Sequence, residues 1–481
     1  MFRLPARFAP VLLTAALITS VGGSPAAAAA GQLDTSFGNG GITSPVDFGS
    51  ADDVAQQSDG KLLALGGRLL VRFTPQGTLD SSFGSGGTVR LPFAENDELY
   101  QFRIWYLPQV AVQRDDGVEK VLVLGRGNLG RLLIARFLPN GSPDRSFGEN
   151  GVLTDDLPLA GSTEMDLVTQ PDGRIIVAAT HPGPQVIVPN VCIPMGDCFG
   201  SVATGPGQGT LTRLLPDGGR DTTFGVDGRT TLPGRGVVGE VLLQPDGKIL
   251  VAAGRLYRLL PDGTPDLSFG VAGQALASAQ DIALGREIVA VSGDRASFST
   301  ISHDGRTVRD HALPSGIETW SLDVAAHPER IVIVDQRRAV GFTWDGALDP
   351  SFGTGGYGPW IGMSHRTLLV QPDGKIVAGG GSGNPPGLSL ARYLSDGPVF
   401  GSIAGSVTQQ KAGSPIAGAS VDCGDGLRAT TGGDGRYSIA NVPPGSRTCV
   451  ASASGFDSAT KQVSVKEGAT AIADFVLRKG R

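Results

Sequence analysis

The stretch Gln244-Pro245-Asp246-Gly247-Lys248, which leads into the apolar run from Ile249 to Ala253, decides the fold. Proline fixes φ, aspartate bonds to nearby backbone amides and glycine accepts a positive φ, so this stretch predicts a tight turn between two strands. The same element recurs, in forms of decreasing regularity, at Gln170 to Arg174, Gln371 to Lys375, Ser58 to Lys61, Asp115 to Gly117, Leu284 to Arg286 and His327 to Glu329. Seven copies of one hairpin element predict a repeat architecture.

Two further elements recur with the same count. A second turn follows each hairpin, and its glycines are Gly77, Gly141, Gly218, Gly263, Gly305, Gly346 and Gly397. After this turn stands an aspartate that is followed three residues later by phenylalanine, at Asp80, Asp144, Asp221, Asp266 and Asp349. The copy near Asp310 has lost its phenylalanine, and Asp34 with Phe37 completes the set of seven.

The two ends of the repeat region complement each other. After the first 30 residues the chain begins with the element Asp34 to Gly38, which has no strand pair before it, and the region ends on the turn at Gly397. A ring in which the N-terminal piece completes the last blade explains both ends, since closure removes exposed strand edges. A linear β-solenoid is the alternative, but its end repeats would be capped, not complementary. We therefore predict an all-β protein with a closed, seven-bladed β-propeller over residues 31–400.

Five arginines stand at one register of the repeat, five residues before the glycine of the second turn: Arg72, Arg136, Arg213, Arg258 and Arg392. Four of them precede the repeated aspartate by eight residues, as Arg72 precedes Asp80. A register that recurs in this way predicts a structural ion pair, or a contact from aspartate to backbone, in each blade. A ligand would be expected at non-repeating positions instead. The glycine-rich turns precede no predicted helix, so they are not phosphate-binding loops.

These repeats resemble the delta-60 repeat family, which is described as β-propellers of unknown function. The resemblance covers residues 31–400, with degraded copies at about 278–345. It implies the propeller fold and supplies no catalytic residue.

Short alternating strands follow over residues 401–481 and predict a β-sandwich. Pro415 to Ala419, Thr430-Thr431, Gly435 to Tyr437 and Val442 to Gly445 resemble the carboxypeptidase regulatory-like domain. That resemblance implies a non-catalytic, transthyretin-like or Ig-like sandwich, related to starch-binding-like folds and often appended to secreted proteins. No His-x-x-Glu zinc motif occurs in the chain.

Residues 1–30 have the pattern of a secretory signal peptide. Arg3 and Arg7 precede an apolar run from Phe8 to Ile18, and a small-residue stretch ends at Ala30. The run is shorter than the roughly 20 residues that span a bilayer, and no later segment is long and apolar enough to do so. We expect a secreted protein without a membrane span, in the extracellular space, the periplasm or at the cell surface.

The four cysteines fall into two local pairs, Cys192 with Cys198 and Cys423 with Cys449. Of the three connectivities possible, this one keeps each disulfide within one local unit, as an oxidising compartment permits. A zinc site is the competing interpretation, but the five histidines are scattered and offer no ligand cluster. We predict no cofactor and no metal.

The charge is uneven along the chain. The net charge of the protein is −6; residues 401–481 contribute +3 and the first 30 residues +2, which leaves −11 for residues 31–400. An acidic body repels phosphate backbones, so nucleic acid is excluded as a partner.

Two insertions interrupt the repeat, and insertions on a rigid scaffold commonly carry function. Residues 91–109 place the carboxylate Glu98 beside four aromatic side chains, Tyr100, Phe102, Trp105 and Tyr106, which form our candidate ligand-binding set. They could stack on a sugar, or they could pack onto the blade as an extended strand. Residues 180–209 are rich in glycine and proline and hold the first cysteine pair, which favours a disulfide-pinned loop over a redox site.

The sequence therefore predicts a non-catalytic binding or scaffold protein, monomeric, whose partner is a glycan or an extracellular or cell-surface protein. The alternative is a secreted hydrolase or lyase that acts in the propeller channel. Such an enzyme would need carboxylates or histidines contributed to the centre by several blades, and no spacing in the sequence singles out a pair.

Overall fold

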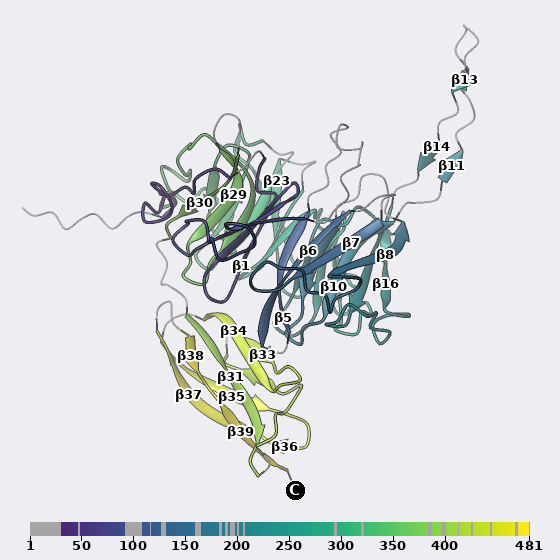
Figure 1. Cartoon of the computed structure of the whole chain (residues 1–481), viewed down its shortest axis with the longest axis vertical. Coiled ribbons are helices and arrows are strands. Elements are labelled where there is room, and N and C mark those ends of the chain that lie inside the picture. Colours follow the sequence, from purple (N-terminus) through teal and green to yellow (C-terminus); the bar gives the residue numbers. More distant parts are fainter. Residues whose placement is uncertain are drawn as a thin grey trace, which may run out of the picture.

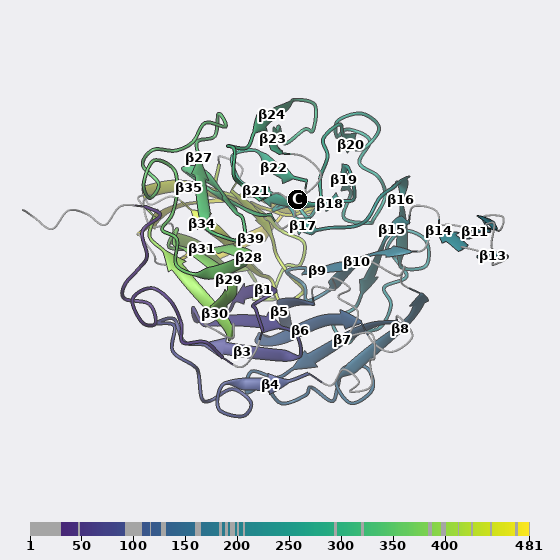
Figure 2. The same ribbon diagram turned by 90° about the horizontal axis from the view of Figure 1, so that it is seen from above.

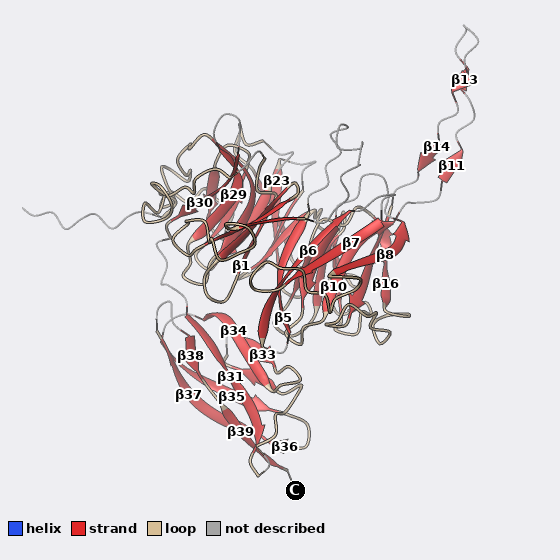
Figure 3. Ribbon diagram, in the orientation of Figure 1, coloured by secondary structure: helices blue, strands red, loops and turns tan. Residues whose placement is uncertain are grey.

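The computed structural model describes residues 30–46, 49–91, 108–115, 117–126, 131–158, 165–181, 185–187, 191–192, 198–199, 202–204, 207–292, 296–318, 322–382, 387–395, 401–411, 413–424, 427–442, 445–466 and 470–480. Apart from Ala30, the predicted signal peptide lies outside these residues. The described residues form strands and no helix, which confirms the all-β prediction (Figure 3).

In the described part of the propeller region, consecutive segments form seven antiparallel sheets of three or four strands, here called blades 1 to 7. Blades 1 and 2 consist of β1 Asp53–Gln56, β2 Leu62–Gly66, β3 Leu69–Phe73, β4 Thr88–Arg90, β5 Gln109–Asp115, β6 Val118–Arg126, β7 Arg131–Phe137 and β8 Val152–Pro158. Blades 3 and 4 consist of β9 Met165–Thr169, β10 Ile175–His181, β15 Gln208–Leu214, β16 Arg229–Arg235, β17 Val241–Leu243, β18 Ile249–Ala252, β19 Leu256–Leu259 and β20 Gln274–Ala275.

The degraded repeats also form sheets. Blades 5 to 7 consist of β21 Asp281–Leu284, β22 Ile288–Val291, β23 Ser297–Ile301, β24 Val308–Ala312, β25 Asp323–His327, β26 Arg330–Val334, β27 Ala339–Phe342, β28 Met363–Val370, β29 Ile376–Ser382 and β30 Gly387–Tyr393. Seen from above, the sheets stand around a central axis, with the first strand of each blade nearest to it (Figure 2).

The predicted hairpin turns form as their residues require. At the turn between β17 and β18, Gly247 has a φ of +83° and its N–H donates to the carbonyl of Gln244 at 2.9 Å. The strand that follows, from Ile249 to Ala252, is buried along its whole length. Second strands are buried on both faces because each lies between two neighbouring blades, which explains why they read as unbroken apolar runs.

Apolar side chains from each pair of neighbouring blades form a cluster, and these clusters continue around the whole ring. The cluster between blades 7 and 1 joins Val377 and Leu388 to Val54 and Leu62, with Phe37 from the N-terminal segment. The core of the propeller is thus a series of contacts between blades, not one central core.

The N-terminal segment provides the outer strand of blade 7, as the complementary ends predict. Leu33, Ile42 and Val46 form antiparallel bridges with residues of β30, from Tyr393 back to Leu388. The N–H of Asp34 donates to the carbonyl of Arg392 at 2.8 Å. Ring closure is therefore confirmed.

Residues from Gly401 onward form two packed sheets, which confirms the predicted sandwich. The first contains β31 Gly401–Gln409, β34 Arg436–Val442, β36 Phe456–Asp457, β38 Thr470–Ile472 and β39 Phe475–Lys479. The second contains β32 Ser420–Asp422, β33 Arg428–Thr430, β35 Gly445–Ser452 and β37 Ala459–Val465. Their inner side chains, among them Ile403, Val421 and Leu477, form one buried cluster.

The two faces of the propeller carry different structures (Figure 1). The sandwich lies beside the face that bears the β5–β6 and β9–β10 turns, which we call the sandwich face. The short strands of the second insertion, β11 Gln185–Ile187, β12 Val191–Cys192, β13 Cys198–Phe199 and β14 Val202–Thr204, extend from the opposite face, which we call the insertion face.

Candidate functional site

The predicted aromatic set cannot be placed, because Glu98, Tyr100, Phe102, Trp105 and Tyr106 all lie outside the described residues. Cys192 and Cys198 are register partners in the β12–β13 pair, as a local disulfide requires, and their bond stays a prediction. Cys423 and Cys449 form a disulfide, which confirms the second pair.

The repeated arginines form the predicted ion pairs and also bridge neighbouring blades. Each Arg Nε or Nη lies 2.8–2.9 Å from its aspartate, in the pairs Arg72–Asp80, Arg136–Asp144, Arg213–Asp221, Arg258–Asp266 and Arg392–Asp34. The guanidinium also stacks on the repeated phenylalanine, as Arg72 does on Phe83 at 4.3 Å. Its Nη1 then donates to a turn carbonyl of the next blade, which for Arg392 is that of Pro75 in blade 1 at 2.7 Å. We call each such group an Arg–Asp cluster.

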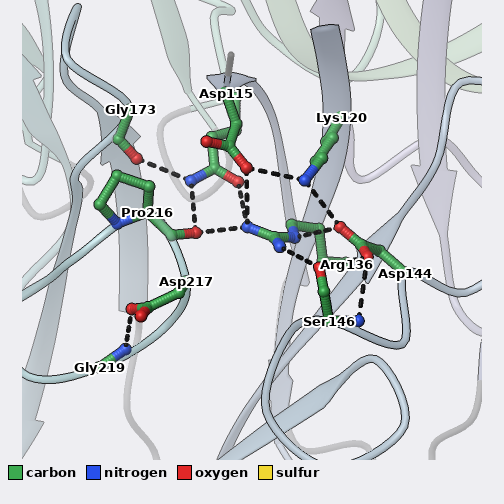
Figure 4. Close-up of polar contacts among 10 residues, drawn as sticks. Asp115, Lys120, Arg136, Asp144, Ser146, Gly173, Pro216, Asp217 and Gly219 are labelled. Carbon is green, nitrogen blue, oxygen red and sulfur yellow. Dashed lines mark hydrogen bonds and ion pairs between the residues drawn. The ribbon is translucent and has the colours of Figure 1, made fainter. Parts of the chain in front are cut away.

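The Arg–Asp cluster of blade 2 shows the complete arrangement (Figure 4). Arg136, which is 1% exposed, pairs with Asp144 and donates to the carbonyl of Pro216 in blade 3. Lys120, the basic residue after the hairpin turn, lies 3.0 Å from the same Asp144 carboxylate. Ser146 donates its hydroxyl to the other carboxylate oxygen at 2.7 Å.

The aspartates of these clusters are held ionised. Burial of Asp80 opposes ionisation, but hydrogen bonds from Ser82 and the charges of Arg72 and Lys61 outweigh it and lower the pKa of Asp80 to about 2. The pKa of Asp266 is likewise lowered to about 2, since Ser268, Lys248 and Arg258 outweigh the effect of burial. The oxygens of these carboxylates are already bound by arginine, lysine and serine side chains of the protein, as expected for structural residues.

The degraded blades replace missing members of the cluster from other positions. In blade 6 the arginine register holds Gly341, and Arg330 of β26 reaches Asp349 instead, at 3.3 Å. In blade 5 the arginine register holds Thr300, and His311 stands where the phenylalanine would be, hydrogen-bonded to Thr300 at 2.9 Å. Blade 5 therefore has neither the arginine nor the phenylalanine of the repeat.

A second set of carboxyl groups gathers around the central axis, and sequence reasoning missed it. Its members stand within one residue of the start of the innermost strand of five blades: Asp53, Asp166, Glu240, Asp281 and Asp323. Each carboxyl group accepts a hydrogen bond of 2.6–2.9 Å from a backbone N–H on the innermost strand of the next blade. The donors are, in the same order, Val110, Val241, Ile282, Val324 and Leu368. We call these five residues the carboxyl ring.

The carboxyl ring is protonated more readily than ordinary carboxylates. Burial, with a smaller contribution from neighbouring carboxylates, raises the pKa of Asp53 and Asp166 to about 7 and that of Glu240 to about 8. Burial and the charge of Glu240 also raise the pKa of Asp281 well above its usual range. Asp281 is hydrogen-bonded to both Glu240 and Asp323, so three carboxyl groups from three blades share protons.

A signal for the carboxyl ring does exist in the sequence. Four members stand four residues before the residue that opens a hairpin turn, as Asp53 precedes Gln57 and Asp323 precedes His327, and Asp281 stands three residues before Leu284, where the degraded turn of blade 5 begins. The two remaining blades have Gln109 and Thr367 at this register. Within the described parts of the chain, no three Asp, Glu, His or Cys side chains are arranged to hold a metal ion.

A polar pocket of about 290 Å³ lies between blades 4 and 5. It is lined by Arg255 of the β18–β19 turn, by Asp310 of β24 and by four serines, with Leu276, Ala277, Ala290 and Gly254 completing the wall. The turns and linkers that contribute to it belong to the same end of the blades as the second insertion, which places the pocket towards the insertion face.

Comparison with protein families supports the architecture. Residues 57–83, 120–147, 244–269 and 371–398 match a domain of unknown function (DUF5122) described as a β-propeller. Residues 402–478 match the carboxypeptidase regulatory-like domain. No curated protein matches the chain.

Solved structures with similar folds have low sequence identity. YCF48 bound to a D1 peptide is 11% identical, with 74% of this chain and 95% of that chain covered and a TM-score of 0.41. YCF48 from Cyanidioschyzon merolae is 13% identical, with coverages of 73% and 97% and a TM-score of 0.36. The extracellular domain of a hybrid two-component system from B. thetaiotaomicron is 8% identical, with coverages of 89% and 57% and a TM-score of 0.35.

Proposed function

Because the chain carries DUF5122 β-propeller repeats and a carboxypeptidase regulatory-like domain, we propose that it is a secreted, non-catalytic binding or scaffold protein. The two modules suggest a binding or scaffold role. The finer proposal is that the insertion face of the propeller presents a recognition surface to a glycan or an extracellular protein, while the sandwich spaces or anchors it. Secretion is proposed from the N-terminal pattern at residues 1–30 and agrees with the Cys423–Cys449 disulfide.

One observation carries this proposal: the repeated charged side chains are engaged in contacts between blades. Arg136 and Asp144 bind each other and the neighbouring blade, and the carboxyl ring binds backbone N–H groups. The repeated charged residues therefore have a structural role. Ligand recognition then falls to the parts that do not repeat, which are the two insertions, the degraded blades and the sandwich.

A binding screen of the purified full-length mature protein against glycans and cell-wall polymers tests the proposal. We expect saturable binding without product formation. A variant in which Asn-Gly replaces residues 182–207 should keep its melting temperature, because β10 and β15 are adjacent and a two-residue turn can join them. A loss of binding in that variant would assign recognition to the second insertion. Unchanged binding would assign recognition to one of the other parts that do not repeat, and the absence of any binding would contradict the proposal.

A hydrolase or lyase in the channel is the second candidate, and the carboxyl ring is the observation that favours it. Carboxyl groups with pKa values of about 7 to 8, such as Asp53 and Glu240, have the protonation behaviour of a general acid. Against it, Asp53 and Asp281 each accept N–H groups on both oxygens. Release of new reducing ends from a polysaccharide, abolished in Asp281→Asn, would favour this enzyme over the binding protein.

A further inference from the structure

The pocket between blades 4 and 5 is built by one face of the blade 5 sheet. Ala290, Ser299 and Asp310 are successive cross-strand partners, so their side chains project from the same face. Ala290 packs in the apolar cluster shared with blade 4, which identifies that face as the one turned towards blade 4. The pocket is therefore a gap in the contact between two blades.

The pocket holds two opposite charges that belong to neither the Arg–Asp clusters nor the carboxyl ring. Among the described residues, the side chain of Arg255 forms no ion pair or hydrogen bond, and Asp310 accepts a hydrogen bond from Ser299 at 2.6 Å without forming an ion pair. This is the reverse of the Arg–Asp clusters, where arginine and aspartate satisfy each other. Asp310 precedes His311, which occupies the phenylalanine position of blade 5, and the two side chains project from opposite faces of β24, so the pocket is separate from the cluster position of this blade.

The rest of the lining supplies hydroxyl groups and apolar side chains. Ser278 and Ser297 each offer a hydroxyl that can donate and accept hydrogen bonds, while the hydroxyl of Ser299, which donates to Asp310, can still accept one. Ser292 and Ser299 are 7% and 6% exposed, so they form the floor of the pocket. Leu276, which is 64% exposed, provides an aliphatic surface at the rim.

We propose that this pocket binds a single neutral sugar residue, with Asp310 and Arg255 holding neighbouring hydroxyl groups and the serines completing the hydrogen bonds. The inference rests on the proposed binding function and assigns its site. A carboxylate accepts from two adjacent hydroxyls while a guanidinium donates to ring or hydroxyl oxygens, and both are charge-assisted hydrogen bonds. Leu276 then covers the C–H face of the sugar.

Size and composition favour a sugar over the nearest competing ligand. The volume of about 290 Å³ lies near the lower end of the roughly 300–1,000 Å³ of ligand sites, which suits one sugar residue. A free amino acid, whose two charges would also match Arg255 and Asp310, needs few hydroxyl partners. The hydroxyl groups of Ser278 and Ser297 would then have no partner on the ligand.

Saturation-transfer NMR and calorimetry on the full-length mature protein test the inference. The probes are glucose, galactose, mannose and N-acetylglucosamine, with glycine and alanine as zwitterionic probes. We expect at least one sugar to bind and Arg255→Gln and Asp310→Asn each to weaken it at least about tenfold. Arg306→Gln is the control, because Arg306 is an exposed arginine of blade 5 that does not line the pocket, and it should bind like the unchanged protein.

The outcomes separate the pocket from the wider proposal. Sugar binding that is unaffected by both pocket substitutions would overturn this inference and leave the binding function standing elsewhere. Binding of glycine or alanine, lost in the same two variants, would overturn the sugar assignment. If none of the six probes binds while polymers do, the site does not recognise a single sugar residue. Equal melting temperatures of all variants would show that losses come from the site and not from unfolding.

Discussion

Two rings of carboxyl groups run around this propeller at two registers of one repeat, and their environments are opposite. The outer ring is that of the Arg–Asp clusters, in which Asp80 and Asp144 each face two cationic side chains. The inner one is the carboxyl ring, in which Asp166 and Asp281 accept backbone N–H groups and face other carboxyl groups. The pKa values therefore diverge, lowered in the outer set and raised in the inner one.

Carboxyl groups therefore join neighbouring blades by two different kinds of contact. At the outer register a full charge binds an arginine that also reaches the next blade. At the inner register the carboxyl oxygen accepts an N–H across the blade boundary, and protonation relieves the cost of gathering acids near one axis.

Removal of residues 31–41 is expected to have the largest effect. It deletes Leu33, Asp34 and Phe37, so Arg392 loses its ion pair and β30 loses the part of its outer neighbour that pairs with Tyr393. We expect the melting temperature to fall by about 10 °C or more, since several hydrogen bonds and an apolar contact are lost together. Differential scanning calorimetry measures this, and an unchanged melting temperature would contradict ring closure by this segment.

Substitution of one buried arginine is expected to come next. Arg136→Met leaves Asp144 with Lys120 alone and leaves the carbonyl of Pro216 without its donor, which should lower the free energy of unfolding by about 3–5 kcal/mol. Arg145→Met is the matched control, because Arg145 is exposed and lies next to Asp144 in the sequence, and should change it by less than about 0.5 kcal/mol. Equal losses from both variants in urea unfolding would argue against a structural role for the cluster.

Arg330→Met in the degraded blade 6 is expected to have a smaller effect. Its ion pair with Asp349 is 3.3 Å long and its distance to the Phe352 ring is 5.6 Å, against 4.3–4.7 Å in the regular clusters. We expect a loss of about 1–3 kcal/mol in the same urea titration. A loss as large as that of Arg136→Met would mean that the replacement arginine is as effective as the original.

The hairpins and ion pairs of the propeller could be predicted from the sequence because they repeat. Turn chemistry at Gln244 to Lys248 and the fixed spacing of Arg72 and Asp80 identify hairpins and ion pairs without reference to distant contacts. The carboxyl ring also has a regular spacing, three or four residues before each turn, but its partners are backbone N–H groups of the next blade, and these carry no sequence signal.

The pocket could not be predicted for a related reason. Arg255, Ser278 and Ser299 come from separate segments of two blades, and only the packing of one sheet against the next brings them together. The role of Arg330 was hidden for the same reason. It supplies the arginine that is missing at the register of Gly341, but it comes from the neighbouring strand. His311, by contrast, stands eleven residues after Thr300 as Phe269 does after Arg258, so this substitution was visible in the sequence.

The dependence of thermal stability on pH tests the contrast between the two rings most directly. The outer aspartates have lowered pKa values, so the stability they provide is present above about pH 4 and is lost as the pH falls towards 2. The carboxyl ring has raised pKa values, so the folded state binds more protons than the unfolded state and stability declines as the pH rises from about 5 to 8.

Melting temperatures of the full-length protein should therefore pass through a maximum near pH 5. In Asp281→Asn, which removes one titrating member of the carboxyl ring, the decline towards pH 8 should become shallower while the acid side stays unchanged. A melting temperature that stays level or rises from pH 5 to 8, or a decline equally steep in Asp281→Asn, would contradict the account.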